Sequence, residues 1–221
     1  MPGWIDDRVD AVIFDHDGTL VDSETVTLTL LATMANELGA DFSYGDIEHL
    51  MGSDIKLVIA AIEQRRGEPV NHADFFDDFR ERQSKELGSG VDEIPGAASL
   101  LQDLEARQVP VAVASNAPRA KVDLCLGVTG LDRFFTPQCR FSAYDINIWK
   151  PEPALFLVAA DHFGVPIERC AIVEDSPPGI AGAVASGAHV IALNIHGAGD
   201  IEGAHNVRSL REASELLLGS T

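Results

Sequence analysis

Five short apolar segments, each followed by polar residues, constrain the fold of this chain more than any other feature. They cover residues 9–15, 109–115, 139–142, 170–174 and 189–194. Segments with helical spacing alternate with these apolar segments. They cover residues 96–107, 118–127, 152–164, 178–187 and 208–218. Continuous apolar strands that alternate with helices are typical of a parallel sheet covered on both faces. The pattern therefore predicts an α/β fold with a Rossmann-like, doubly wound parallel sheet.

An unusually long interval separates the first two apolar segments. Roughly 90 residues lie between Asp17 and Val109, far more than a crossover connection needs. Helical patterns in this interval cover residues 25–38, 43–51, 54–67 and 72–88. We therefore expect residues 24–91 to form an inserted helical domain, and residues 1–23 and 92–221 to form the core. A helical insert tethered over the ligand edge of the sheet would act as a hinged lid.

The first apolar segment ends in two carboxylates one residue apart, Asp15 and Asp17, followed directly by Gly18 and Thr19. Because strand side chains alternate, both acids can project the same way from the carboxyl end, where open α/β sheets bind their ligands. Acids this close repel each other, and a divalent cation relieves the repulsion. Gly18 leaves room for a ligand beside backbone N–H groups. The spacing predicts a site for phosphate and Mg²⁺, with His16 directed away from both acids.

Two plainer interpretations of this segment are open. Asp, Gly, Thr and Ser are ordinary turn residues, so the segment could be only a strand end and a turn. The beginning Asp-x-Asp-Gly also fits part of a calcium loop, which needs a bidentate Glu at its twelfth position. That position is Val26 here, which disfavours calcium.

Polar side chains also follow the other apolar segments. Ser115 and Asn116 end the second segment, where a hydroxyl before a helix suits phosphate but also suits an ordinary N-cap. Lys150 precedes a helix-starting proline and is one of only four lysines in the chain; the alternative is a solvated lysine. Glu174 and Asp175 end the fourth segment, either as a cation-sharing pair or as a solvated pair beside a helix.

Taken in chain order, these four groups of polar residues resemble the four motifs of the haloacid dehalogenase (HAD) superfamily of phosphohydrolases. The nonamer 15–23 is similar to the first motif, DxDGT(L/V)xDS, and departs only at His16. Ser115, Lys150 and the pair Glu174-Asp175 resemble the second, third and fourth motifs. The resemblance implies a Rossmann-like core with a helical cap inserted after the first motif.

The resemblance also implies a role for each matching residue. Asp15 would be the nucleophile that forms an aspartyl phosphate, and Asp17 the general acid and then the general base. The implied catalytic residues are Asp15, Asp17, Ser115 and Lys150. The implied substrate-binding residues are Gly18, Ser115, Asn116 and Lys150. The implied Mg²⁺ ligands are Asp15, Asp17 through its main-chain carbonyl, Asp175, and Glu174 either directly or through water.

The size and the helical insert resemble the β-phosphoglucomutase-like branch of the superfamily. Mutases of that branch carry a cap histidine and two basic cap residues at positions occupied here by Thr27, Met51 and Ile55. The stretch 141–155 looks like that of bacterial phosphatases acting on 6-phosphogluconate. We therefore expect a Mg²⁺-dependent phosphatase for a small phosphorylated sugar or sugar acid. A sugar phosphate mutase and a non-catalytic phosphate-binding module are the alternatives.

The composition of the chain limits the kinds of partner and the location that we expect for the protein. Asp and Glu number 35 against 16 Lys and Arg, a net charge of −19, which argues against binding nucleic acid. No apolar run reaches about 18 residues, so we expect no membrane span. The acidic start of the chain lacks the pattern of a signal peptide, and the three cysteines lack a CxxC spacing. We expect a cytoplasmic protein with reduced cysteines, a monomer or a weak homo-oligomer.

Overall fold

The computed structural model describes residues 3–43, 45–46, 55–194 and 201–219. The chain divides into two compact units. Met1–Val21 and Asp92–Thr221 form one, called here the core unit, and Asp22–Val91 form the other, called the insert unit. The helix expected over residues 43–51 lies mostly outside the described residues.

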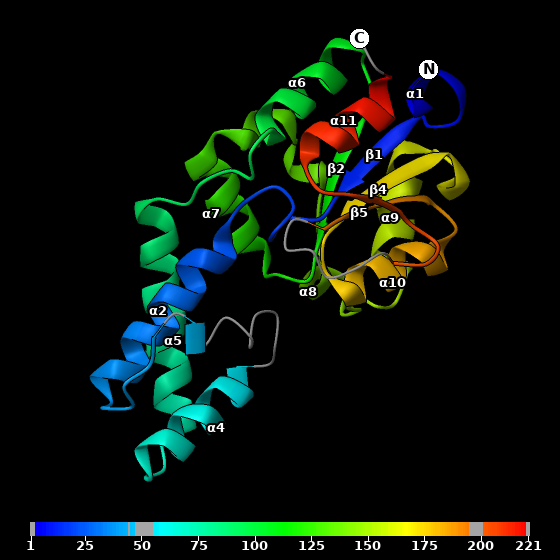
Figure 1. Ribbon diagram of the computed structural model, residues 1–221. Coiled ribbons are helices and arrows are strands. Elements are labelled where there is room, and N and C mark those ends of the chain that lie inside the picture. Colours follow the sequence, from blue (N-terminus) through cyan, green and yellow to red (C-terminus); the bar gives the residue numbers. More distant parts are fainter. Residues whose placement is uncertain (1–2, 44, 47–54, 195–200, 220–221) are drawn as a thin grey trace. The chain divides into compact units, whose positions relative to one another are not determined.

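Within the described residues, the core unit is built on a six-stranded parallel sheet in the order β3-β2-β1-β4-β5-β6 (Figure 1). Its strands are β1 (Ala11–Phe14), β2 (Val111–Ser115), β3 (Arg140–Ser142), β4 (Cys170–Glu174), β5 (His189–Leu193) and β6 (His205–Val207). All four residues of β1 are fully buried, because helices cover both faces of the sheet. The strand order proceeds outward in both directions from β1 and β4, which confirms the doubly wound α/β fold.

The sequence predicted five of these strands and missed β6. Its three residues, His205, Asn206 and Val207, carry no apolar run, and only Val207 is buried. The strand is defined by its pairing with β5, in which Ile191 lies opposite His205. Tertiary pairing therefore forms this edge strand where local sequence gives no signal.

Helices cover both faces of the sheet (Figure 1). On one face, α9 packs against β1, β2 and β3, and α10 packs against β4 and β5. Their buried apolar side chains, including Leu155, Phe156 and Ile180, join Ile13 and Ile172 in one core. The core-unit helices are α1 (Trp4–Asp7), α6 (Ala97–Ala106), α7 (Arg119–Thr129), α8 (Ala143–Ile146), α9 (Ala154–Phe163), α10 (Pro177–Ser186) and α11 (Leu210–Leu218), with 3-10 turns η1 (Leu131–Phe134), η2 (Pro137–Cys139) and η3 (Ile167–Arg169).

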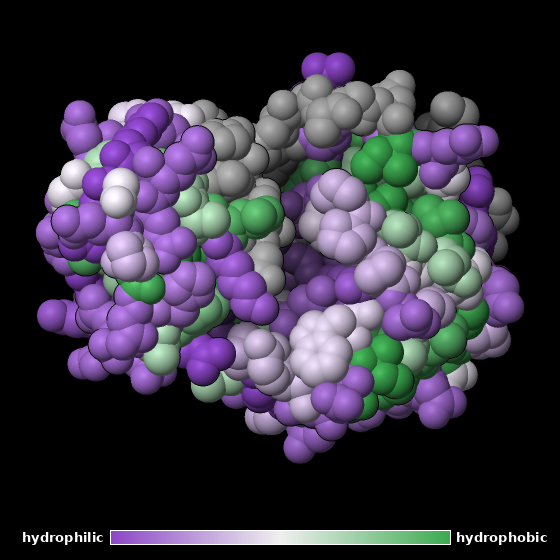
Figure 2. Space-filling model, turned by 90° about the horizontal axis from the view of Figure 1, so that it is seen from below, coloured by the Kyte–Doolittle hydropathy of each residue, from purple (hydrophilic) through white to green (hydrophobic). Residues whose placement is uncertain are grey.

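The described helices of the insert unit are α2 (Ser23–Glu37), α4 (Ile55–Arg66) and α5 (His72–Ser89). The side chain of Asp22 accepts a hydrogen bond from the Thr25 amide (3.2 Å) and so caps α2. The three helices enclose an apolar core that includes Leu31, Ile59 and Phe75. The face of this unit that is visible on the left of Figure 2 is mostly hydrophilic. Among the described residues, none of the helices is long and apolar enough to cross a bilayer.

The two chain segments that connect to the insert are paired with each other in the core unit. Val21 forms an isolated antiparallel bridge with Glu93, and the Ile94 amide donates to the Leu20 carbonyl at 2.9 Å. The chain therefore leaves and re-enters the core unit at adjacent positions.

The carboxyl ends of β1 and β4 lie side by side. Phe14 is in register with Val173, and the Asp15 amide donates to the Val173 carbonyl at 2.9 Å. The strand order reverses between these two strands, and such a switch point leaves a crevice at the carboxyl ends, where open α/β sheets bind ligands. The fold therefore brings the polar ends of the first and fourth apolar segments together.

We predict that Ile13→Ala lowers the free energy of unfolding by about 2 to 5 kcal/mol, because it removes buried methyl groups and leaves a cavity in the central strand. Val158→Ala on α9 is the control, since Val158 is 40% exposed, and it should change stability by less than about 0.5 kcal/mol. Urea unfolding followed by circular dichroism measures both. Equal effects of the two substitutions would contradict the packing described for β1.

Candidate active site

A buried lysine joins the ends of β1 and β4. Lys150 Nζ donates hydrogen bonds to Asp15 Oδ1 and, at 2.6 Å, to Glu174 Oε2. Asp15 and Lys150 are each 6% exposed and Glu174 is fully buried. Buried charges are tolerated only when they are paired. This ion-pair cluster therefore fixes three of the residues predicted from the sequence in one place.

Three carboxylates converge at this point. Asp15, Glu174 and Asp175 each offer an oxygen, and these oxygens lie within 4.8 Å of one another. Two hydroxyls orient them: Thr19 Oγ1 donates to Asp175 Oδ1 at 2.7 Å, and Ser176 Oγ donates to Glu174 Oε1 at 2.7 Å. Neither hydroxyl was predicted from the sequence, although Thr19 lies inside the nonamer 15–23 and Ser176 directly follows the pair Glu174-Asp175.

Two glycines allow the carboxylates to approach the backbone. A Cβ on Gly18, whose φ is +81°, would lie 2.2 Å from Asp175 Oδ2. A Cβ on Gly179 would lie 2.0 Å from Glu174 Cδ. Neither space can hold a methyl group without displacing an acid. Gly18 thus serves the site by giving room to Asp175, and the predicted contact of its backbone with substrate stays a prediction.

The electrostatics of the cluster suit a divalent cation. Burial and the neighbouring Glu174 carboxylate raise the pKa of Asp15 well above its usual range, although Lys150 opposes them. Burial disfavours the Lys150 ammonium, but Asp15 and Glu174 outweigh it and raise the pKa of Lys150. The Lys150 ammonium thus pairs with two of the three carboxylates, and all the ligands that the three offer are oxygens. This donor set fits a hard cation such as Mg²⁺.

Asp17 is held by a different set of partners. Lys121 Nζ lies 2.7 Å from Asp17 Oδ1, and His16 Nδ1 lies 3.2 Å from the same oxygen. Burial opposes ionisation of Asp17, but Lys121 and His16 hold its pKa well below the usual range. The expectation that His16 points away from both acids is wrong. Its ring is fully buried and contacts Asp17, because the turn at Gly18 departs from strict strand alternation.

Ser115 and Asn116 follow the next strand of the sheet, β2. The buried Ser115 hydroxyl accepts a hydrogen bond from the Ala117 amide at 3.0 Å. Asn116 Oδ1 accepts from the Lys150 amide at 2.9 Å, and Asn116 Nδ2 donates to the Lys150 carbonyl at 3.4 Å. Asn116 therefore fixes the backbone that carries Lys150, a contact that the sequence did not indicate. Direct binding of phosphate by Ser115 and Asn116 stays a prediction.

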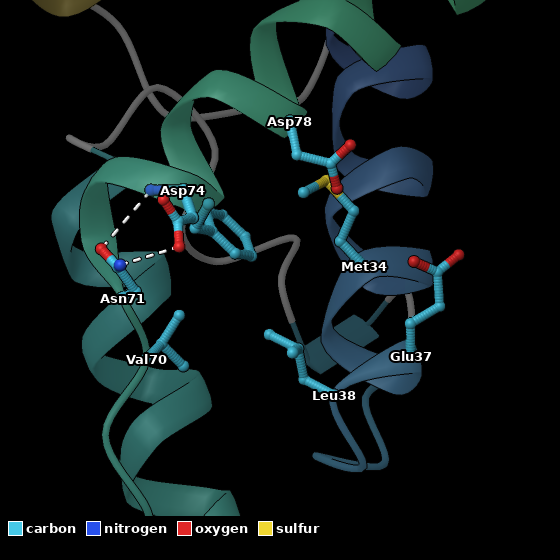
Figure 3. A pocket seen from close by; sticks show the side chains of 8 residues that line it. Met34, Glu37, Leu38, Val70, Asn71, Asp74 and Asp78 are labelled. Carbon is cyan, nitrogen blue, oxygen red and sulfur yellow. Dashed lines mark hydrogen bonds between the residues drawn. The ribbon is translucent and has the colours of Figure 1, made fainter.

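A separate cavity of about 360 Å³ lies within the insert unit (Figure 3). It combines apolar side chains with three carboxylates, and the residues that line it are Met34, Glu37, Leu38, Val70, Asn71, Asp74, Phe75 and Asp78. The acids Glu37, Asp74 and Asp78 would repel an anionic ligand. This cavity is therefore a poor candidate for a phosphate site.

The comparison with protein families agrees with the geometry. Residues 12–193 match the family described as haloacid dehalogenase-like hydrolase. The chain belongs to this family. Membership in the HAD family and the phosphatases among its relatives support a phosphoric monoester hydrolase.

Two of the relatives come from Escherichia coli K12. A 6-phosphogluconate phosphatase is 32% identical over 83% of this chain and 81% of its own length. Hexitol phosphatase A is 28% identical over 85% of this chain and 84% of its own length. A solved HAD family hydrolase from Deinococcus radiodurans R1 superposes with a TM-score of 0.80 at 31% identity, over 95% of this chain and 98% of that one.

We predict that Gly179→Ala destabilises the core unit by about 1 to 3 kcal/mol, because its methyl group must displace the buried Glu174 side chain. Gly127→Ala on α7 is the matched control. A Cβ there meets nothing within 4 Å, so this change should leave stability unaltered or raise it by up to about 1 kcal/mol. Thermal and urea unfolding distinguish them, and equal tolerance of both changes would contradict the crowding at Glu174.

Proposed function

We propose that this HAD-family hydrolase is a Mg²⁺-dependent phosphatase that acts on a small phosphorylated sugar or sugar acid through an aspartyl phosphate on Asp15. The observation that carries the proposal is the buried Asp15 carboxylate, paired with Lys150 at the β1/β4 switch point. A carboxylate held there can meet a phosphoryl group in line, and a fixed cation beside it offsets the charge that develops.

In the first step, an Asp15 oxygen attacks phosphorus and the bond to the leaving-group oxygen breaks. Asp17 must carry a proton in this step, although Lys121 and His16 lower its pKa, and it donates that proton to the leaving-group oxygen as general acid. Lys150, with the hydroxyl of Ser115 and the side chain of Asn116, binds the phosphoryl oxygens and stabilises their negative charge. The product alcohol leaves, and Asp15 carries the phosphoryl group.

In the second step, water attacks the phosphorus of the aspartyl phosphate. Asp17, now ionised, accepts a proton from this water as general base, and the bond from phosphorus to the Asp15 oxygen breaks. Inorganic phosphate leaves and the Asp15 carboxylate is restored. The contact with Lys121, 2.7 Å from Asp17 Oδ1, favours the ionised Asp17 that this step requires.

Asp15, Glu174, Asp175 and the main-chain carbonyl of Asp17 would hold Mg²⁺. The bound cation supplies positive charge that favours the ionised form of Asp15 and offsets negative charge on the phosphoryl oxygens. Lys150 neutralises only part of the cluster, which is consistent with a requirement for a second cation.

The substrate class is proposed from the relatives. The two Escherichia coli relatives are named 6-phosphogluconate phosphatase and hexitol phosphatase A, and the Deinococcus structure contains bound phosphate and sodium. We take 6-phosphogluconate as the first candidate and assign the role of cap, which would contact the leaving group, to the insert unit. A mutase has less support, because Thr27 stands where mutases of this branch carry histidine. In this structure the Thr27 hydroxyl makes two hydrogen bonds within the insert unit. It donates to the Ser23 carbonyl at 2.8 Å and accepts from Gln83 Nε2 at 2.9 Å.

A panel of phosphate esters tests the function. The panel contains 6-phosphogluconate, a hexose 6-phosphate, a hexitol phosphate and a nucleoside monophosphate, and inorganic phosphate is measured. We expect release from a sugar or sugar acid phosphate with Mg²⁺, loss of release in EDTA, and recovery when Mg²⁺ is restored. Release unaffected by EDTA would contradict the metal requirement. Isomerisation of a hexose 1-phosphate with a bisphosphate primer, without phosphate release, would favour a mutase.

We predict that Asp15→Asn lowers phosphate release by more than about a thousandfold, because an amide cannot replace the attacking carboxylate. The protein should still fold, as judged by circular dichroism. Asp103→Asn removes an exposed carboxylate on α6 and should leave turnover within about twofold. Near-normal turnover of Asp15→Asn would rule out the covalent mechanism.

A further inference from the structure

Lys121 is a second cation at this site, and its contact with Asp17 was not predicted from the sequence. It lies in the first turn of α7, the helix that follows β2. Its ammonium is 2.7 Å from Asp17 Oδ1, and its side chain is only 22% exposed. The chain has only four lysines. Two of them, Lys121 and Lys150, are directed at the pair of acids that follows β1.

The position of Lys121 is fixed by its helix. The Lys121 amide donates to the Pro118 carbonyl at 2.9 Å. The neighbouring Val122 and Cys125, one turn further on, are buried in the core unit. Side chains carried on a rigid element are held more closely than those on loops. The ammonium therefore approaches Asp17 from a fixed direction.

The two lysines have different partners. Lys150 bonds to Asp15 and Glu174, whereas Lys121 contacts Asp17. Under the proposed function, the nucleophile and the acid/base thus have separate cations, carried by separate segments of the chain. Asp17 precedes Gly18, whose φ is +81°, so its backbone lies in a tight turn rather than in the strand. His16 Nδ1, next to it in the chain, lies 3.2 Å from Asp17 Oδ1, and Lys121 is a partner that approaches the same oxygen from a separate helix.

We propose that Lys121 is a positioning residue that orients the Asp17 carboxylate for proton transfer to the leaving group. This inference rests on the proposed function, in which Asp17 is the general acid. A displacement of about 1 Å in a reacting group can cost about a hundredfold in rate. An ammonium at hydrogen-bond distance from Asp17 Oδ1 restricts rotation of that carboxyl group, and the proton transferred to the leaving group would be carried by Oδ2.

The test replaces Lys121 by Met, which keeps an apolar stem of similar length and removes the ammonium. The substrates are 6-phosphogluconate, whose leaving group needs a proton, and p-nitrophenyl phosphate, whose leaving group does not. We expect kcat on 6-phosphogluconate to fall about 10- to 100-fold with KM within about twofold. First-turnover release of p-nitrophenolate should fall by less than about threefold. Lys121→Arg should restore part of the loss.

A double-mutant cycle separates positioning from other roles. The rates of p-nitrophenolate release and of 6-phosphogluconate turnover are measured for Asp17→Asn, Lys121→Met and the double variant. If Lys121 acts through Asp17, adding Lys121→Met to Asp17→Asn should change each rate by less than about twofold. Losses that multiply would overturn the inference, because they would show that Lys121 acts independently of Asp17.

Arg133→Met is the control for removal of a cation. Arg133 is exposed in η1, which precedes β3, so it lies toward the opposite end of the strands from the site. Its kinetics should match wild type. A rise in KM for Lys121→Met with unchanged kcat would overturn the inference in favour of substrate binding, and equal losses on both esters would overturn it in favour of a structural role. A wild-type protein that releases no phosphate from any ester would overturn the proposed function itself.

Discussion

The site depends on one buried ammonium, that of Lys150, between Asp15 and Glu174. These two acids stand at the ends of different strands and would repel each other in a medium that water does not screen. The lysine makes their proximity tolerable, and its own backbone is fixed by Asn116 at the end of β2. Three strands of the sheet are therefore tied to a single charge, and the placement of Asp15 follows from that arrangement.

The topology explains why such a charge cluster forms at this edge of the sheet. The chain order reverses between β1 and β4, and such a switch point leaves a crevice at the carboxyl ends of the strands. Asp15 and Asp17 follow β1, and Glu174 and Asp175 follow β4. Gly18 and Gly179 then remove the side-chain atoms that would keep these acids from packing so closely.

Much of this arrangement could be predicted from the sequence, because long apolar segments determine which strands are central and which residues follow them. β1 and β4 were expected for that reason, whereas the meeting of Asp15 with Glu174 was expected from the resemblance to the HAD motifs. The short edge strand β6 was not, because its pairing with β5 depends on tertiary contacts. The contacts of Lys121 and His16 with Asp17 were missed too. They depend on the direction of a helix and on a turn, which residue spacing does not encode.

The pairing of Val21 with Glu93 and of Leu20 with Ile94 has a consequence for how the protein folds. β1 and β2 must find each other across the whole insert, and closing so long a loop costs chain entropy. An insert that becomes compact first, on its own apolar core, already brings its two ends near each other. The insert unit would then shorten the search that joins the two halves of the sheet.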